Sequence, residues 1–569
     1  FSHKGYTVKE LLGRKIGIAE GRSRGCLCLY TIVIEVEVGM AGDIQPQGDD
    51  PTPSDILEDQ KCGDVSHFFR QFKRLYLVYR NHPEAYWPTV GFFGVQMCWA
   101  VQITYVSSYL ITLGMTNETV GFAWLAGPLS GIIVQPIVGL WSDHSESKWG
   151  RRRPYIIFGT VCSVIGLLGF SNAEAFGYWL GDSGGSHPAG LVLAVFFFFF
   201  MDFAINYAMG PMVALLADTA STEVYPYGQA WFAAHNGLGK TVGYALGSIS
   251  LTSLAAFAWL GSNLRALFLL AAVGTAAASA LMALKTPEVP HRRPGGAPRP
   301  AAREVLAEIW AGLTQLPLPI HRAFVVQCFS YFAWDTTFIY VATWMGETVY
   351  GGGSDSSDSD YGAYEDGVEA ASLGYMGMAI ISVLWAMVLP MLGRLLGVRL
   401  LWALNLLLFA LILVLFATVR TGQRAYAVFL VTLLGFPLAG TYQIPWAIVT
   451  VVAEETPEKV ALLTTIFNMS QCFPEIIVSL IGGSWIDLCG EWLGSIFLLG
   501  AAGALGAAAL CYTVVQPPNL YDRKSVVPVA RGPTRTLSGE VTEGAPSGQA
   551  VEAGGARNQE GDSLTLNLL

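Results

Sequence analysis

The chain has 569 residues, of which 53% are hydrophobic and only 13% are charged, with a mean hydropathy of +0.45. Soluble proteins have about a quarter of their residues charged, so this composition excludes an ordinary soluble protein and leaves room for roughly a dozen membrane spans. The formal net charge of −10 argues against a nucleic-acid partner. Nine cysteines without framework spacing predict no disulfide scaffold.

The segment before the first long apolar run, residues 1–86, is predicted to be cytoplasmic and largely disordered. Within it, Met40 opens a polar, acidic stretch that is typical of a transporter N-terminus. We therefore expect the native protein to begin at Met40, with residues 1–39 either spurious or a poorly ordered extension.

Apolar runs of spanning length recur from residue 87 onward. They predict an all-α membrane protein with twelve transmembrane helices in two six-helix halves, residues 87–284 and residues 322–515. The expected spans cover residues 88–114, 118–141, 154–173, 189–217, 229–258, 263–284, 322–350, 368–393, 399–419, 425–452, 461–484 and 492–515.

Two further polar segments flank the second half. Residues 285–321 are rich in Pro and Arg and predict a flexible basic cytoplasmic linker, with one short interfacial helix around residues 303–313. Residues 516–569 are rich in Gly, Ala, Glu, Ser and Thr. Such a composition cannot bury an apolar face and predicts a disordered cytoplasmic tail.

Three consecutive arginines, Arg151, Arg152 and Arg153, follow Asp143 in the loop between the second and third spans. Basic residues between spans mark cytoplasmic loops, so we expect this loop, the linker and both termini on the cytoplasmic side. We interpret Asp143 and the three arginines as a cytoplasmic gate motif that clasps the two halves together in the outward-open state. Simple anchoring of the topology is the alternative.

Asp202 is the leading functional candidate, because it lies deep in the fourth span behind a run of phenylalanines. A charged side chain at mid-membrane costs roughly 2.5 to 3.5 kcal/mol on insertion scales, so such residues mark proton and substrate pathways. Asn206 follows four residues later and shares the helical face. We expect Asp202 to carry the coupling proton and both residues to bind substrate hydroxyls. A structural hydrogen bond between helices is the alternative.

The first span contains Gln96, Trp99 and Gln102. Gln96 and Trp99 face one way, and Gln102 is turned from them by roughly a third of a circle. An aromatic ring beside amides suits the apolar faces and hydroxyl edges of a sugar. All three are therefore candidate substrate-binding residues, with packing inside the bundle as the alternative.

Three other ionisable residues lie within spans and are secondary candidates. They are Asp335 in the seventh span, Lys240 in the fifth and Glu475 in the eleventh. Either carboxyl group can act in transport or pair with a cation, and Lys240 can also extend to the interface.

The tenth span contains two prolines and several small residues, which permit bending and close helix contact. Thr441, Tyr442 and Gln443 are expected to offer polar groups to a substrate cavity there. Helix packing alone is the alternative.

The sequence has no Walker lysine loop, so it gives no support to ATP-driven pumping. It also has no zinc or haem spacing. We therefore expect no enzymatic activity, no metal and no other cofactor.

Four groups of motifs together resemble a known family. They are Gly94-Val95-Gln96 with Trp99-Ala100-Val101-Gln102, the segment 127–136, Ser142-Asp143 with the segment 150–156, and the segment 434–439 with Thr441-Tyr442 and Ile444-Pro445. They look like the sucrose–proton symporters of the glycoside–cation symporter branch of the major facilitator superfamily. Plant sucrose carriers and animal proton-associated sugar transporters share the pattern, and the resemblance covers about residues 87–515.

The resemblance implies a major facilitator fold in which the aspartate of the fourth helix, here Asp202, couples the proton. Two positions depart from the family pattern. Plant members usually carry a basic residue where this chain has Val213. Many members have an acidic-threonine-acidic triplet before Trp-Met-Gly, where this chain has Val341-Ala342-Thr343.

We therefore expect proton-driven symport of a disaccharide, sucrose or a related glucoside, across a lipid bilayer by alternating access. The plasma membrane is expected in preference to a vacuolar or other internal membrane. One alternative keeps the fold and makes the protein a facilitator or exporter of a monosaccharide or polyamine. Another is a non-transporting membrane receptor or scaffold.

Overall fold

The computed structural model describes residues 82–183, 186–221, 224–288, 301–355, 359–454 and 460–514. The predicted start at Met40, almost all of the predicted N-terminal segment and the C-terminal tail lie outside the described residues. Within the described ranges, each of the twelve expected spans is helical, and the fold is the predicted all-α bundle.

The first half consists of the helices that precede the linker. These are α5 (Pro83–Tyr86), η1 (Trp87–Thr89), α6 (Gly91–Thr112), α7 (Val120–Ala123), α8 (Ala126–Leu129), η2 (Ser130–Val134), α9 (Gln135–Asp143), α10 (Arg153–Ser171), α11 (Ala173–Leu180), α12 (Pro188–Thr219), α13 (Tyr225–Gly247), η3 (Leu251–Ser253), η4 (Ala258–Leu260) and α14 (Asn263–Lys285). The fifth expected span was predicted to reach residue 258, but α13 ends at Gly247 and two short 3₁₀ turns follow it.

The linker helix and the second half follow in the same way. They comprise α15 (Ala302–Thr314), α16 (Leu318–Trp344), η6 (Met345–Val349), α17 (Tyr361–Leu396), α18 (Val398–Phe416), α19 (Arg424–Leu433), α20 (Gly435–Glu454), α21 (Val460–Leu488), α22 (Gly494–Leu510) and η8 (Cys511–Thr513).

Two interruptions within the expected spans bear on the interior of the bundle. The second span is divided into α7, α8, the π-helical η2 and α9, and the tenth is divided at Leu434 into α19 and α20. Pro437 has no N–H to donate to the carbonyl four residues earlier, which suits its place in the first turn of α20, where backbone N–H groups have no partner within the helix. Both interruptions lie in helices that contribute residues to the interior.

Nine of the described helical segments are long and apolar enough to cross a membrane. The helices α13, α16 and α21 fall outside this group, and they are the ones that carry Lys240, Asp335 and Glu475. A membrane bundle exposes its apolar helices to lipid and turns ionisable side chains toward its interior. The least apolar helices therefore indicate where the functional interior lies.

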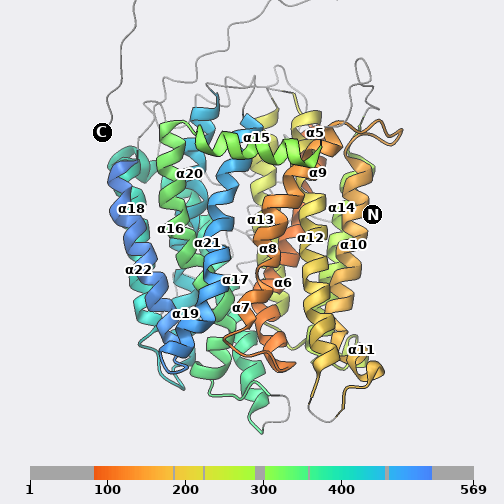
Figure 1. The fold of residues 1–569 in the computed structure, drawn as a ribbon, viewed down its shortest axis with the longest axis vertical. Helices are drawn as coiled ribbons and strands as arrows, with labels where there is room; N and C mark the ends of the chain where they lie inside the picture. Colours follow the sequence, from red (N-terminus) through yellow and green to blue (C-terminus); the bar gives the residue numbers. More distant parts are fainter. Residues whose placement is uncertain are drawn as a thin grey trace, which may run out of the picture.

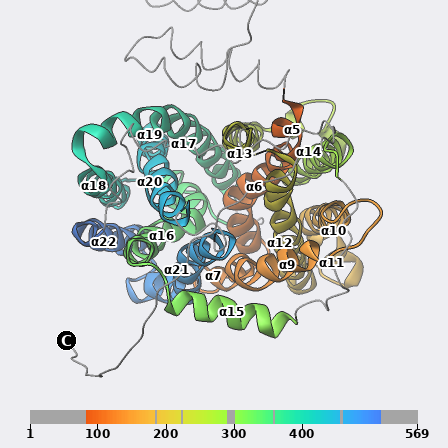
Figure 2. The same cartoon turned by 90° about the horizontal axis from the view of Figure 1, so that it is seen from above.

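The helices stand side by side with roughly parallel axes (Figure 1). Seen along the bundle, α10, α12 and α14 gather on one side and α18, α20 and α22 on the other (Figure 2). The two halves meet where α13 packs against α17, where α6 packs against α16, and where α7 and α8 pack against α21. The seam between the halves therefore runs through the middle of the bundle.

Glycines allow close helix packing inside the first half. A β-carbon built on Gly94 of α6 would lie 2.6 Å from the Cα of Thr275 on α14, and one on Gly166 of α10 would lie 2.7 Å from the Cβ of Met201 on α12. Small residues at helix contacts are the usual means by which membrane helices associate. The first half is thus a tightly packed unit.

The linker helix α15 lies across one end of the bundle, and α11 lies at the opposite end (Figure 1). The linker helix α15 contacts α9 of the first half and α21 of the second. Its buried Ile309 packs with Ile466 and Met469 of α21, and Ile132 and Leu140 border the same apolar cluster. This helix therefore bridges the two halves at the end that we call the α15 end.

Candidate functional site

Asp202 and Glu475 approach each other from opposite halves at Gly127. Asp202, on α12, is only 4% exposed, and Glu475 is partly buried on α21. A β-carbon built on Gly127 of α8 would lie 2.8 Å from Oε1 of Glu475 and 3.5 Å from Oδ2 of Asp202. Both carboxyl groups therefore converge on one point of the seam, and glycine leaves the space that they occupy.

Asp335 extends this carboxyl cluster within the second half. It is buried on α16 and interacts electrostatically with Glu475. Its Oδ2 atom is buried and has no hydrogen-bond partner in the described part of the chain. Tyr331 lies one turn earlier on the same helix and interacts with both Asp335 and Tyr442. Because a buried polar atom without a partner is costly, this site has capacity to bind a proton or a ligand.

Asn206 lies one turn from Asp202 on α12. Its Nδ2 donates a hydrogen bond to Oγ of Ser130 at 2.8 Å, and this serine begins the π-helical η2. The contact is a hydrogen bond that joins two helices. Such a structural hydrogen bond was the alternative interpretation given above for Asp202 and Asn206. Single π-helical turns occur frequently at functional sites, and this one places Ser130 beside the Asp202 face.

The two amides of α6 are buried on different faces of that helix. Gln102 faces Asp202, whereas Gln96 faces α13, where a β-carbon on Gly239 would lie 3.0 Å from its Cβ. The Oε1 of Gln96 is buried without a hydrogen-bond partner among the described residues, whereas the Gln102 amide is directed at the Asp202 carboxyl group. Trp99 is partly buried and packs against the main apolar core. Gln102, the residue turned away from the other two, is thus the one that neighbours the carboxyl cluster.

Lys240 of α13 contacts Tyr442 of α20 across the seam. Its Nζ lies 3.4 Å from the tyrosine hydroxyl oxygen and 4.5 Å from the ring centroid, which is a cation–π contact. Among the described residues, Lys240 forms no ion pair with a carboxylate. Tyr442 is 40% exposed and interacts with Tyr331, so the two tyrosines connect the lysine to the carboxyl cluster.

Thr441 has its polar groups engaged in helix packing. Its Oγ1 accepts a hydrogen bond from Trp334 Nε1 at 3.0 Å and donates one to the Pro437 carbonyl at 3.0 Å, while its own carbonyl accepts from Gln327 Nε2 at 3.2 Å. Its side chain is 1% exposed. Thr441 therefore joins α20 to α16 in this conformation, and we leave it out of the proposed sugar site. Gln443 is partly buried, and its Oε1 has no partner in the described residues.

The predicted gate motif forms an ion-pair network around Asp218 near the end of α12. Arg151 and Arg152 both bind the Asp218 carboxylate, and Arg152 also binds Asp143. Burial lowers the pKa of the Arg152 guanidinium, but its contacts with Asp218 and Asp143 outweigh burial and hold that pKa above its usual value. The arginine therefore stays charged at any physiological pH.

The remaining contacts of this network involve the first residues of the linker, directly after α14. Glu288, just beyond α14, accepts hydrogen bonds from the backbone N–H groups of Arg152 at 2.6 Å and Arg153 at 3.2 Å. The Arg153 side chain donates to the Thr286 carbonyl. The described partners lie in the first half or directly after α14, and a clasp between the halves in the outward-open state stays a prediction. In this conformation the motif ties α9, α10, α12 and α14 to one another.

The halves are joined closely at the end opposite α15. Asn117 Nδ2, in the loop before α7, donates to Glu347 Oε2 at 3.3 Å, and Asn263 Nδ2 of α14 donates to Glu369 Oε1 of α17 at 2.8 Å. A β-carbon built on Gly121 of α7 would lie 2.6 Å from the backbone carbonyl oxygen of Ser479 on α21. Backbone approach and polar contacts thus close the seam at this end.

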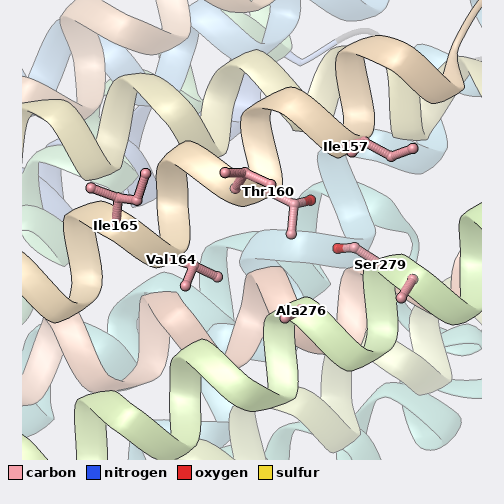
Figure 3. Close-up of a pocket in the computed structure, with 8 residues that line it drawn as sticks. Ile157, Thr160, Val164, Ile165, Ala276 and Ser279 are labelled. Atoms are coloured by element: carbon pink, nitrogen blue, oxygen red, sulfur yellow. The ribbon is translucent and has the colours of Figure 1, made fainter.

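A cavity of about 300 Å³ lies away from the seam, between α10 and α14 (Figure 3). Its lining is apolar apart from the hydroxyl groups of Thr160 and Ser279, and Val161 and Ile165 beside it are about half exposed. Because these helices face outward from the first half, the cavity opens toward the lipid side. It is therefore separate from the carboxyl cluster.

Sequence reasoning did not single out Gly127, Ser130 or Tyr331 as site residues. Tyr331 could have been found, because its spacing of four from Asp335 places both on one helical face. The role of Gly127 depends on contact between helices that are distant in sequence, which spacing does not reveal. In the part of the chain that the structure describes, no group of three or more His, Cys, Asp or Glu residues could hold a metal ion.

Comparison with curated proteins finds similarity to plant sucrose carriers. The chain is 28% identical over 440 residues to "Sucrose transport protein SUT1" of Oryza sativa subsp. japonica, covering 70% of this chain and 81% of the relative. It is also 28% identical over 505 residues to "Sucrose transport protein SUC3" of Arabidopsis thaliana, covering 73% and 85%. These relatives match most of their own length.

Solved structures and a family model agree on the fold. A D-xylose-proton symporter matches with a TM-score of 0.53 at 15% identity, covering 76% of this chain and 97% of that one. The nucleoside transporter NupG matches with a TM-score of 0.52 at 14% identity, covering 76% and 98%. The family model described as Major Facilitator Superfamily matches residues 88–474. The chain is therefore an integral, multi-pass membrane protein that belongs to the Major Facilitator Superfamily.

Proposed function

We propose that this protein is a carrier, not an enzyme, and that it performs proton-coupled symport of a disaccharide, sucrose or a related glucoside. The observation that carries the proposal is the buried carboxyl group of Asp202, which faces the seam between the halves beside the Gln102 amide. The similarity to sucrose transport proteins of two plants supports the choice of cargo.

In the proposed cycle, Asp202 takes up a proton from the outer side and thereby becomes neutral. The neutral carboxyl group can then donate a hydrogen bond to a sugar hydroxyl, whereas the ionised group can only accept one. The unpartnered Oε1 of Gln96 and the Gln102 amide beside Asp202 are proposed to provide an acceptor and a donor for further hydroxyl groups. Trp99 and Tyr442 are proposed to offer aromatic surface to the apolar face of the sugar.

Release requires the halves to rock about the seam. We propose that the structure represents a state closed on the outer side, because the contacts of Asn117 and Asn263 join the halves at the end opposite α15. Opening at the α15 end would expose Asp202 and allow proton and sugar to leave. The Asp143 and Arg151–Arg153 network would keep the first half rigid during this motion.

The proposed orientation places the α15 end and both termini in the cytoplasm. This follows from the positive-inside rule, because α15 contacts α9, the helix that leads into Arg151–Arg153, and Lys285 and Arg303 are described basic residues of the linker. The plasma membrane is the proposed location, where an inward proton gradient would drive uptake.

One observation favours a second candidate cargo. Asp202, Glu475 and Asp335 gather in the interior, while the nearby cation, Lys240, contacts Tyr442 instead of a carboxylate. An excess of acidic groups suits an amine-bearing cargo such as a polyamine. Direct competition between the two cargoes distinguishes these proposals.

The test is uptake of radiolabelled sucrose by yeast that lacks its own sugar transport, measured at pH 5 and pH 7. We expect accumulation above the external concentration at pH 5 that a protonophore abolishes. A matched assay with radiolabelled putrescine tests the second cargo. Putrescine accumulation without sucrose accumulation would reject the sucrose proposal.

A further inference from the structure

We propose that the cavity between α10 and α14 is a binding site for a sterol, which enters from the lipid and places its single hydroxyl group between Thr160 and Ser279. The site lies on the lipid-facing side of the first half, apart from the carboxyl cluster. It is independent of the cargo that the carrier moves.

Two hydroxyl groups of the cavity lining have no hydrogen-bond partner. Thr160 on α10 is 7% exposed and Ser279 on α14 is 3% exposed, and neither hydroxyl oxygen has a partner in the described part of the chain. Both side chains point into the cavity (Figure 3). An unpaired buried hydroxyl group is costly, and at lipid depth no water is present to pair with it. A ligand that brings its own hydrogen-bonding group would remove this cost.

Other hydroxyl groups on the same two helices are satisfied within their own helix. Ser163 Oγ of α10 donates to the Gly159 carbonyl at 2.8 Å, and Thr275 Oγ1 of α14 donates to the Ala271 carbonyl at 2.8 Å. A bond to the carbonyl four residues earlier is the usual solution for a serine or threonine inside a helix. Thr160 and Ser279 depart from it, and both face the same cavity.

The rest of the lining restricts the chemistry of the ligand. The eight described residues that line the cavity include no charged side chain, and apart from the two hydroxyl groups they are Ile, Val and Ala. A charged lipid headgroup would therefore lose its hydration without finding a counter-ion. Two protein hydroxyl groups can together donate to and accept from one third hydroxyl. The lining thus suits an apolar molecule with a single hydroxyl group.

The walls of the cavity favour a rigid ligand over a flexible one. Ile157, Val161 and Val164 of α10 are β-branched and have few rotamers in a helix, whereas α14 contributes the small Ala276 and Ala280. A fused ring system loses little conformational freedom against such a wall, but an acyl chain loses much. The volume of about 300 Å³ is at the lower end for small-molecule sites. Because the cavity is open to lipid, the remainder of a sterol can stay in the bilayer.

The depth of the two hydroxyl groups gives the ligand an orientation. Thr160 follows the first residue of α10, Arg153, and Ser279 precedes the last residue of α14, Lys285, by roughly 10 Å along each helix axis. Val164 and Ile165 lie farther from these helix ends, toward the middle of the membrane. A sterol in this leaflet keeps its polar end toward the nearer interface, since burying that end unpaired is costly. The ring system would therefore extend past Val164 and Ile165.

Photolabelling tests the site in membranes from cells that express the full chain. The probe is a cholesterol analogue with a diazirine in the ring system and an alkyne in the tail, and labelled peptides are identified by mass spectrometry. We expect labelling of α10 or α14 beside the cavity. Excess cholesterol should displace the probe, and cholest-5-ene, which has the same ring system without the hydroxyl group, should compete about tenfold less well.

Two matched leucine variants separate the cavity from the general lipid surface. Ala280 and Ala277 are both exposed alanines of α14, but only Ala280 lines the cavity. Ala280→Leu fills the space, so labelling of the cavity should fall about tenfold, whereas Ala277→Leu should leave it unchanged. Labelling that is equal in the two variants overturns the inference.

A third variant removes both hydroxyl groups, with Thr160→Val and Ser279→Ala combined. Because neither group has a partner among the described residues, this variant should keep the wild-type melting temperature in sterol-free detergent. It should also lose the preference for cholesterol over cholest-5-ene. A preference that persists rejects the role of the two hydroxyl groups.

Competition on the wild type decides the matter even if a variant does not reach the membrane. Equal competition by cholesterol and cholest-5-ene overturns the inference, and so does probe attachment only outside α10 and α14. Displacement of the probe by excess phosphatidylcholine as readily as by cholesterol would show that an acyl chain occupies the cavity, which also overturns it. None of these results bears on sucrose transport, so the proposed function is tested separately.

Discussion

Asp218 should be the most important acid of the arginine network for the stability of the first half. It binds both Arg151 and Arg152, and the Arg152 side chain is only 3% exposed. Removing one partner of a buried ion pair typically costs 3–5 kcal/mol, because the other charge is left without compensation. Arg152 keeps Asp143 in the Asp218→Asn variant, so we expect a loss at the lower end, about 3 kcal/mol.

Asp143→Asn is the matched comparison. The Asp143 side chain is 43% exposed, and its only ion pair in the described part of the chain is with Arg152, so its loss should cost about 1 kcal/mol or less, as for surface ion pairs. The assay is thermal unfolding of the detergent-solubilised protein, followed by fluorescence-detection size-exclusion chromatography. We expect a far larger fall in melting temperature for Asp218→Asn than for Asp143→Asn. Equal falls, or a larger one for Asp143→Asn, would refute the reasoning.

Two other substitutions test the assignments of packing and closure. Thr441→Val removes the acceptor of the Trp334 hydrogen bond, so it should lower the free energy of unfolding by about 1 kcal/mol. The KM for sucrose should not change. A several-fold rise in KM would show that Thr441 belongs to the sugar site. Gly483→Ala places a methyl group against the Glu118 backbone at the closed end, so the maximal rate of uptake should fall severalfold while equilibrium sucrose binding persists. An unchanged rate would show that this contact does not limit closure.

The sequence pattern predicted the helical fold well because each span is a long apolar run, and membrane depth fixes its length. Breaks within spans were harder to locate. The π-helical η2 and the early end of α13 depend on contacts with neighbouring helices, and hydropathy carries no information about those contacts. Asp202 could be identified from the sequence because an acid inside an apolar run is costly wherever the helix lies.

The arrangement around Asp202 was less accessible from sequence. Gln102 lies on a different face of α6 from Gln96, and only contact between helices shows that it faces Asp202. Glu475 approaches Asp202 because Gly127 has no side chain in the space between them. Within the predicted gate motif Arg152 binds Asp143, but the other partners of the arginines were not predictable. Asp218 and Glu288 reach the arginines only because α12 and α14 end beside them.

The central claim is that ionisation of Asp202 couples the proton gradient to sugar movement. The most direct measurement compares wild type and Asp202→Asn in vesicles, recording both sucrose accumulation under an imposed proton gradient and sucrose counterflow without one. The account predicts that Asp202→Asn loses gradient-driven accumulation but retains counterflow, because the amide still hydrogen-bonds sugar and cannot exchange a proton. Full, pH-dependent accumulation by Asp202→Asn would contradict it.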